Sequence, residues 1–153
     1  MLTTPHVLVG LYLATHLPPT LALPLALIAH FIFDYFYPHW NPHLYTEKKN
    51  LGRLSTNTLK IIVADGILAL SLLAFVILWN HNSLQQIIVL MMAAFLSVLP
   101  DLMEIPYYFL GKKTNFWKAI INFEHKYQAR ANFTWGVLSQ ILVIVVCLWQ
   151  III

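Results

Sequence analysis

The sequence predicts an all-α fold: a polytopic bundle of about four membrane-spanning helices, forming a single integral membrane domain over residues 1–153. The chain is 59% hydrophobic and carries only nine Lys/Arg and six Asp/Glu, whereas soluble domains spend about a quarter of their residues on charge. Several uncharged stretches also approach the roughly 20 residues that a helix needs to cross a bilayer. We therefore expect lipid, not water, to surround most of the chain.

Four apolar stretches are the expected spans, at residues 20–37, 61–79, 84–99 and 133–153, and the third runs on through Pro100 and Asp101. A short helix is expected before them over residues 5–16. Pro18-Pro19 separates this helix from the first span, because proline cannot continue a helix and extends its predecessor. The short helix is predicted to be re-entrant or to pack at the rim of the bundle.

The basic residues predict the orientation. They lie in two loops, Lys48, Lys49, Arg53 and Lys60 in the first and Lys112, Lys113, Lys118, Lys126 and Arg130 in the second, while the turn at residues 80–83 has none. By the positive-inside rule both basic loops are cytoplasmic, and the turn and the C-terminus lie outside. Since the charges do not follow one helical face, no nucleic-acid partner is expected.

The second basic loop also predicts a cytoplasmic interfacial helix. Its apolar residues, from Phe116 to Phe123, alternate with lysines in the pattern of a helix lying at the headgroups, although such a helix could also cap the bundle. The single Cys147 excludes an intramolecular disulfide and a cysteine-based zinc site. No cleaved signal peptide and no glycine-rich phosphate loop are expected.

Ionisable residues inside apolar helices carry the chemical information, because burying a charge in a bilayer is costly without a partner. His30 and Asp34 are four residues apart, which places both side chains on one helical face in good geometry for one metal ion. The alternative is a buried His-Asp hydrogen bond that only locks the helices together. The predicted topology puts Asp34, Asp65 and Asp101 at one membrane depth, as a site requires.

His6 joins this level if the short helix starts inside, and His125 follows in the cytoplasmic segment. Imidazole and carboxylate together suit zinc, manganese or iron. We therefore predict a catalytic divalent-metal site for zinc, with manganese as the alternative, and with His6, His30, Asp34, Asp101 and His125 as ligands. His39 and His43 could extend it.

Two acids have predicted roles in catalysis. Asp65 could be a ligand, a partner to His30 or His6, or a proton-relay group. Glu104, three residues after Asp101, could act as general base, although both carboxylates could also be solvated at a helix end. Glu124 and His125 point in different directions on a helix, and His125 is predicted to face the site, a surface histidine being the alternative.

The early Thr-Pro-His6, the His30-x-x-x-Asp34 pair and Leu99-Pro100-Asp101 resemble the YdjM-like, LexA-regulated, membrane-bound metal-dependent hydrolases. A more distant similarity is to the zinc-dependent phospholipase C class. The resemblance implies a multi-pass hydrolase of a bacterial inner membrane. The family's usual motif is Pro-Asp-x-Asp. This chain departs from it, because Pro100-Asp101 is followed by Leu102, Met103 and then Glu104.

The expected function is therefore hydrolysis of a lipid phosphoester at the cytoplasmic face, with membrane lipids as partners and an oligomer possible. Three lysines, Lys112, Lys113 and Lys118, are predicted to hold the substrate's phosphate. A metal or proton transporter and a structural or assembly factor are the alternatives. The outer halves of the spans are almost free of polar residues, which leaves no visible path for an ion.

Overall fold

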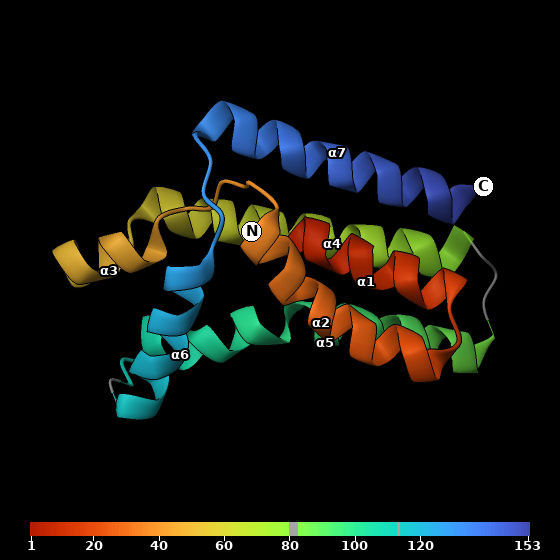
Figure 1. Cartoon of the computed structure of the whole chain (residues 1–153), viewed down its shortest axis with the longest axis horizontal. Coiled ribbons are helices and arrows are strands. Elements are labelled where there is room, and N and C mark those ends of the chain that lie inside the picture. Colours follow the sequence, from red (N-terminus) through yellow and green to blue (C-terminus); the bar gives the residue numbers. More distant parts are fainter. Residues whose placement is uncertain (80–82, 113) are drawn as a thin grey trace.

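A computed structural model describes residues 1–79, 83–112 and 114–153. Within these residues the chain forms seven helices and no strand (Figure 1), and their bounds are α1 Thr3–His16, α2 Pro19–Phe36, α3 Leu44–Leu51, α4 Thr56–Trp79, α5 Leu84–Tyr108, α6 Asn115–Tyr127 and α7 Phe133–Ile152. The all-α prediction is confirmed. The turn predicted at residues 80–83 falls, for 80–82, outside the described residues.

Four helices, α2, α4, α5 and α7, are long and apolar enough to cross a membrane. Their outward side chains are large and apolar: Leu70, Leu78, Trp135 and Trp149 are each at least 64% exposed. Such a surface is stable in a hydrocarbon solvent and would aggregate in water. The predicted spans are confirmed, with α4 beginning five residues earlier than expected, at Thr56, and α5 continuing to Tyr108.

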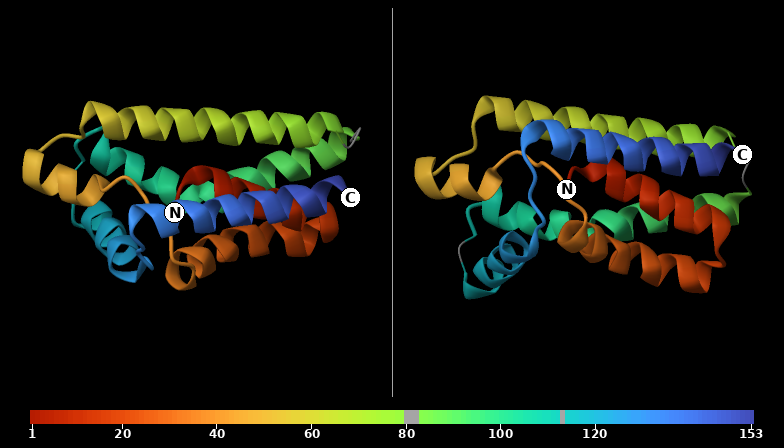
Figure 2. Two further views of the ribbon diagram at one scale, coloured as in Figure 1. Left: turned by 90° about the horizontal axis from the view of Figure 1, so that it is seen from above. Right: turned by 45° about the horizontal axis from the view of Figure 1, so that its top comes forward.

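The short helix α1 lies at the centre of the bundle, between α2, α4, α5 and α7, as both views in Figure 2 show. Leu8 and Leu11 are fully buried in this position. The prediction that α1 packs at the rim is therefore wrong. Its residues are apolar on all sides, and a helix with no polar face is buried all round.

Close packing of α1 on α5 depends on small residues. A Cβ atom added at Gly10 would lie 2.8 Å from the carbonyl oxygen of Ala93 and 3.0 Å from Ser97. Glycine permits this approach of two backbones, as small residues do between membrane helices. Packing of α1 against α5 brings His6, one turn before Gly10, to the level of Asp101.

Helices α3 and α6 extend from one end of the bundle, away from the C-terminus of α7 (Figure 1). Helix α6 packs against α5 through Ile121 and Glu124 and leaves Phe116 and Phe123 exposed. The predicted amphipathic helix is thus present. It covers one end of the bundle while offering an apolar face outward.

Candidate metal centre

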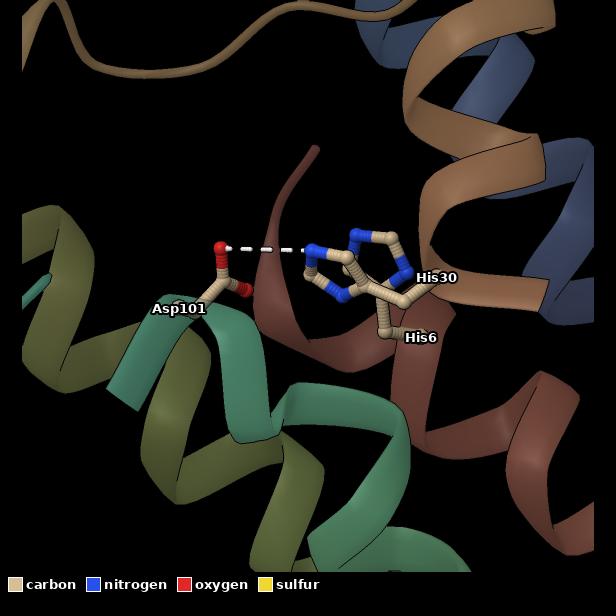
Figure 3. Close-up of side chains that lie close together, drawn as sticks. All are labelled: His6, His30 and Asp101. Carbon is tan, nitrogen blue, oxygen red and sulfur yellow. Dashed lines mark ion pairs between the residues drawn. The ribbon is translucent and has the colours of Figure 1, made fainter. Parts of the chain in front are cut away.

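Three helices bring together the side chains of His6, His30 and Asp101 (Figure 3). One potential ligand atom from each lies within 4.8 Å of the other two. The rings of His6 and His30 are stacked, with centroids 4.1 Å apart, and the Nε2 atom of His30 lies 3.9 Å from Asp101 Oδ1. The predicted convergence of α1, α2 and α5 at one level is therefore confirmed for these residues.

Asp34 lies beside this group on α2. Its Oδ1 atom is 3.2 Å from His6 Nε2 and its Oδ2 atom is 3.8 Å from His30 Nε2, so the two residues of the His-x-x-x-Asp pair share a face as predicted. The amino group of Met1 lies 2.7 Å from the same Oδ1 atom and is buried. The buried Asp34 carboxylate is therefore paired with one cationic group, the amino group of Met1.

His30 has a fixed tautomer. Its Nδ1 atom lies 2.8 Å from the carbonyl oxygen of Ser97, which can only accept, so Nδ1 carries the hydrogen. Because Pro100 has no N–H group, the carbonyl of Leu96 lacks its usual helical hydrogen bond. This loosens α5 next to the Ser97 carbonyl. The Nε2 lone pair of His30 therefore points toward the carboxylates of the site.

That lone pair has no hydrogen-bond partner in the described part of the chain, although Nε2 is buried. It faces Asp34 at 3.8 Å and Asp101 at 3.9 Å. A lone pair opposite two carboxylates, of which Asp34 is buried and Asp101 is partly exposed, is unfavourable unless a cation lies between them. A metal-ligating imidazole has this arrangement, with one nitrogen held by a carbonyl and the other open.

His39 repeats the pattern from the segment after α2. Its Nδ1 atom donates to the carbonyl of Tyr37 at 2.8 Å, and its Nε2 atom, buried and without a hydrogen-bond partner among the described residues, lies 3.8 Å from Asp34 Oδ1. Burial and the Met1 amino group lower the pKa of His39 to about 4. The ring is therefore neutral at neutral pH and can accept a cation.

Backbone pairing holds His39 in place. Its N–H donates to Ala129 at 3.0 Å and its carbonyl accepts from Ala131 at 2.9 Å, while the N–H of Ala129 donates to the carbonyl of Asp34 at 2.7 Å. The sequence suggested that His39 and His43 could extend the site, and only His39 reaches it. The pairing depends on the segment after α6, which is distant in sequence.

Asp65 does not face the histidines. Its carboxylate accepts hydrogen bonds from the N–H of Thr3 at 2.6 Å, the N–H of Thr4 at 3.2 Å and the hydroxyl of Thr4 at 2.6 Å. These are the open N–H groups at the start of α1, which lack a cap from their own segment. Asp65 therefore anchors α1 to α4. Its roles as a ligand, as a partner to His30 or His6 and as a proton relay stay predictions.

The sequence favoured His125 over Glu124 as the residue that faces the site, but the structure buries Glu124 instead. Glu124 is only 7% exposed, and burial, together with the nearby Asp101 carboxylate, raises its pKa to about 7, while a hydrogen bond with Glu104 lowers it. His125 instead stacks on Tyr45, with ring centroids 3.8 Å apart, and contacts Arg130. It lies apart from the predicted ligands.

Two of the lysines predicted to hold the substrate's phosphate lie away from the site. Lys112 and Lys118 are exposed near the start of α6 and line none of the cavities that reach the site, and Lys113 falls outside the described residues. Glu104 lines a cavity of about 430 Å³ together with Asp101. A second apolar cavity, of about 410 Å³ between α2 and α6, is lined by His30, Asp34 and Glu124.

The site is thus built from side chains of α1, α2 and α5 and the segment around His39, with apolar cavities on two sides. Sequence reasoning missed Glu124 and the Met1 amino group, and it gave His39 no firm role. No family model, curated protein or solved structure matches the chain. The chemistry of these residues therefore carries the functional argument alone.

Proposed function

We propose that this protein is a membrane-embedded, metal-dependent hydrolase that cleaves a phosphoester of a lipid. The observation that carries the proposal is the pair of buried Nε2 atoms, on His30 and His39, that face Asp34 without a hydrogen-bond partner in the described residues. Two imidazole nitrogens and a carboxylate aimed at one space favour a divalent cation.

The ligands would be His6, His30, Asp34 and Asp101, with His39 reaching the Oδ1 side of Asp34. Nitrogen and oxygen donors of this kind suit zinc, and manganese as an alternative. A bound ion of this class would lower the pKa of a coordinated water and so supply a nucleophile at neutral pH. The motif resemblance to membrane-bound metal-dependent hydrolases agrees with this choice.

Other residues of the chain would orient the metal ligands and exclude water from the site. Carbonyls of Ser97 and Tyr37 fix the His30 and His39 rings, and Asp65 holds the start of α1 so that His6 stays at the level of Asp101. Glu104, one helical turn after Asp101 and lining the same cavity, is placed to accept a proton from the attacking water. The apolar cavity walls keep bulk water from the site.

The lipid substrate follows from the surroundings. Both apolar cavities beside the site are walled by apolar side chains of helices that are long enough to span a membrane. With both basic segments placed inside by the positive-inside rule, the site would lie at the cytoplasmic face of a cell membrane, which the motif resemblance makes a bacterial inner membrane.

The test is phosphoester hydrolysis by detergent-purified protein on mixed phospholipid micelles, assayed before and after chelation and after addition of zinc or manganese. Activity that falls on chelation, returns with metal and is lost in Asp101→Asn supports the proposal. The matched control is His16→Ala, since His16 is exposed at the far end of α1. Hydrolysis unaffected by chelation, or equal in Asp101→Asn, would contradict it.

A further inference from the structure

Two adjoining cavities differ in character. The apolar cavity, of about 430 Å³, lies between the start of α1, α4 and α5. The polar annex, of about 40 Å³, lies beside it among the residues that follow α2 and the end of α6. Asn41, Glu104 and Gln128 line both, so the two cavities form one cleft. Asn41 donates to Gln128 at 3.0 Å.

The apolar cavity suits a hydrocarbon chain. Its walls include Leu44, Ile62, Leu102, Ile105 and Phe109, and its volume lies in the usual range for small-molecule sites, about 300 to 1,000 Å³. A polar ligand would lose its hydration here without gaining hydrogen bonds along these walls. Helices α4 and α5, which supply Ile62 and Ile105, are membrane-span candidates, so a lipid chain can approach from the bilayer.

The polar annex suits an anion. Arg130 lines it with His43 and His125, and the Nη2 atom of Arg130 donates to the backbone carbonyl of His125 at 3.0 Å. In the described part of the chain the hydrogen bonds of this guanidinium all use Nη2. Its Nε and Nη1 donors therefore remain for a ligand, and arginine binds phosphate oxygens through paired donors.

The size of the annex limits the group that it can hold. One water molecule needs a cavity volume of about 10 to 15 Å³. The annex of about 40 Å³ therefore holds a few heavy atoms. A phosphate has that size, and a sugar or choline ester attached to it would have to extend out of the annex. Glu104 lines both cavities one turn after Asp101, so a phosphate at this boundary would be next to the candidate metal ligands.

We propose that the cleft binds a lipid whose headgroup is a terminal phosphate monoester, with its chain in the apolar cavity and its phosphate between Asp101 and Arg130. The inference rests on the proposed function, which it narrows to one substrate class. In the reaction the water oxygen bonds to phosphorus, the bond from phosphorus to the lipid oxygen breaks, and a water proton passes to that oxygen. The products are a lipid alcohol and inorganic phosphate.

Binding of a non-hydrolysable probe tests the inference. The probe is a fluorescent phosphonate analogue of phosphatidic acid, bound to zinc-supplemented protein in detergent and displaced by unlabelled lipids. The unlabelled phosphonate should displace it at concentrations at least about tenfold lower than phosphatidylglycerol or diacylglycerol. Glycerol 3-phosphate, which has the phosphate without the chain, should not displace it. Displacement by glycerol 3-phosphate, or equal displacement by phosphatidylglycerol, would overturn the inference.

Two variants with matched controls locate the site. Arg130→Gln should weaken probe binding about tenfold, whereas Lys118→Gln, a basic residue that lines neither cavity, should leave it unchanged. Ile62→Trp should block the apolar cavity, whereas Ile67→Trp, on the same helix and 61% exposed, should not. Equal binding by all four variants would overturn the inference. Metal content measured in the same samples separates the two proposals, since metal retained without lipid selectivity contradicts only this one.

Discussion

Two histidine rings, those of His30 and His39, are held at one nitrogen and left open at the other, whereas His6 Nε2 lies within hydrogen-bond distance of Asp34, at 3.2 Å. His30 and His39 each donate Nδ1–H to a backbone carbonyl and direct Nε2 toward Asp34. A purely structural His-Asp pair would instead place the ring N–H on the carboxylate, at hydrogen-bond distance. The tautomers thus favour a cation at this position over a simple lock between helices.

Asp65 should affect stability and not metal binding. In Asp65→Asn the amide can replace only one acceptor oxygen, so its NH₂ group would face the N–H groups of Thr3 and Thr4. We expect the free energy of unfolding to fall by about 1.5 to 3 kcal/mol, measured as a lower thermal unfolding midpoint in detergent. The folded variant should keep its metal. Loss of metal without loss of stability would instead support Asp65 as a ligand.

Glu124 should make stability depend on pH. Its pKa in the folded protein, about 7, lies above its ordinary value of 4.5 because of burial. The folded state therefore retains the proton between pH 4.5 and 7 while the unfolded state loses it, so stability falls as pH rises through this window. Unfolding midpoints of metal-free protein should show this fall, and Glu124→Gln should flatten it. An identical pH dependence in the two proteins would refute this assignment.

At the scale of elements, sequence patterns predicted which helices are spans better than they predicted how the helices pack. Hydropathy identified α2, α4, α5 and α7 because a spanning helix must be apolar along its length. It predicted a re-entrant helix or one at the rim because a helix over residues 5–16 is too short to span. The central position of α1 depends on Gly10 and on the Asp65 anchor, and neither contact leaves a local pattern.

The crossing of α1 and α5 should not tolerate a methyl group. Gly10→Ala would place Cβ 2.8 Å from the carbonyl oxygen of Ala93, so the helices must move apart and carry His6 away from Asp101. We expect a lower unfolding midpoint and weaker metal binding. Gly66→Ala on α4 is the control, since no atom lies within 4 Å of its added Cβ. It should be neutral or slightly stabilising. Equal stability of the two variants would argue against close packing at Gly10.

The candidate site was partly predictable from sequence. His6, His30, Asp34 and Asp101 could be found because ionisable residues in apolar helices are few and their depths follow from topology. His39 could not be assigned, since its position depends on backbone pairing with Ala129 and Ala131. Glu124 was passed over for His125 because the rotation of α6 against α5 is set by tertiary contacts.

For the whole molecule, both basic segments should lie on one side of the membrane. Helices α3 and α6 leave the same end of the bundle (Figure 1). Cysteines placed singly at Lys49 and Lys118, in a Cys147→Ser background, should react with an impermeant maleimide in inside-out vesicles and not in intact spheroplasts. Labelling of the two positions from opposite sides would contradict this arrangement.

The distribution of charged side chains along the bundle also bears on the transporter alternative. The candidate ligands come from the α3 and α6 end of the molecule, where the two apolar cavities reach them. The opposite halves of α4 and α7 carry no charged side chain, from Ile67 to Trp79 and from Gly136 to Ile152. Crossing them would strip an ion of its ligands, so a surface enzyme fits the molecule better than a channel.

The most direct test of the account is metal content, measured by mass spectrometry on detergent-purified wild type beside His30→Ala, Asp34→Ala and the control His16→Ala. The account predicts about one or two equivalents of zinc or manganese in the wild type and in His16→Ala. Both site variants should lose this metal while still folding, as judged by their helical circular dichroism. No metal in any preparation, or full metal in His30→Ala, would contradict the central claim and leave the His-Asp cluster as a structural feature.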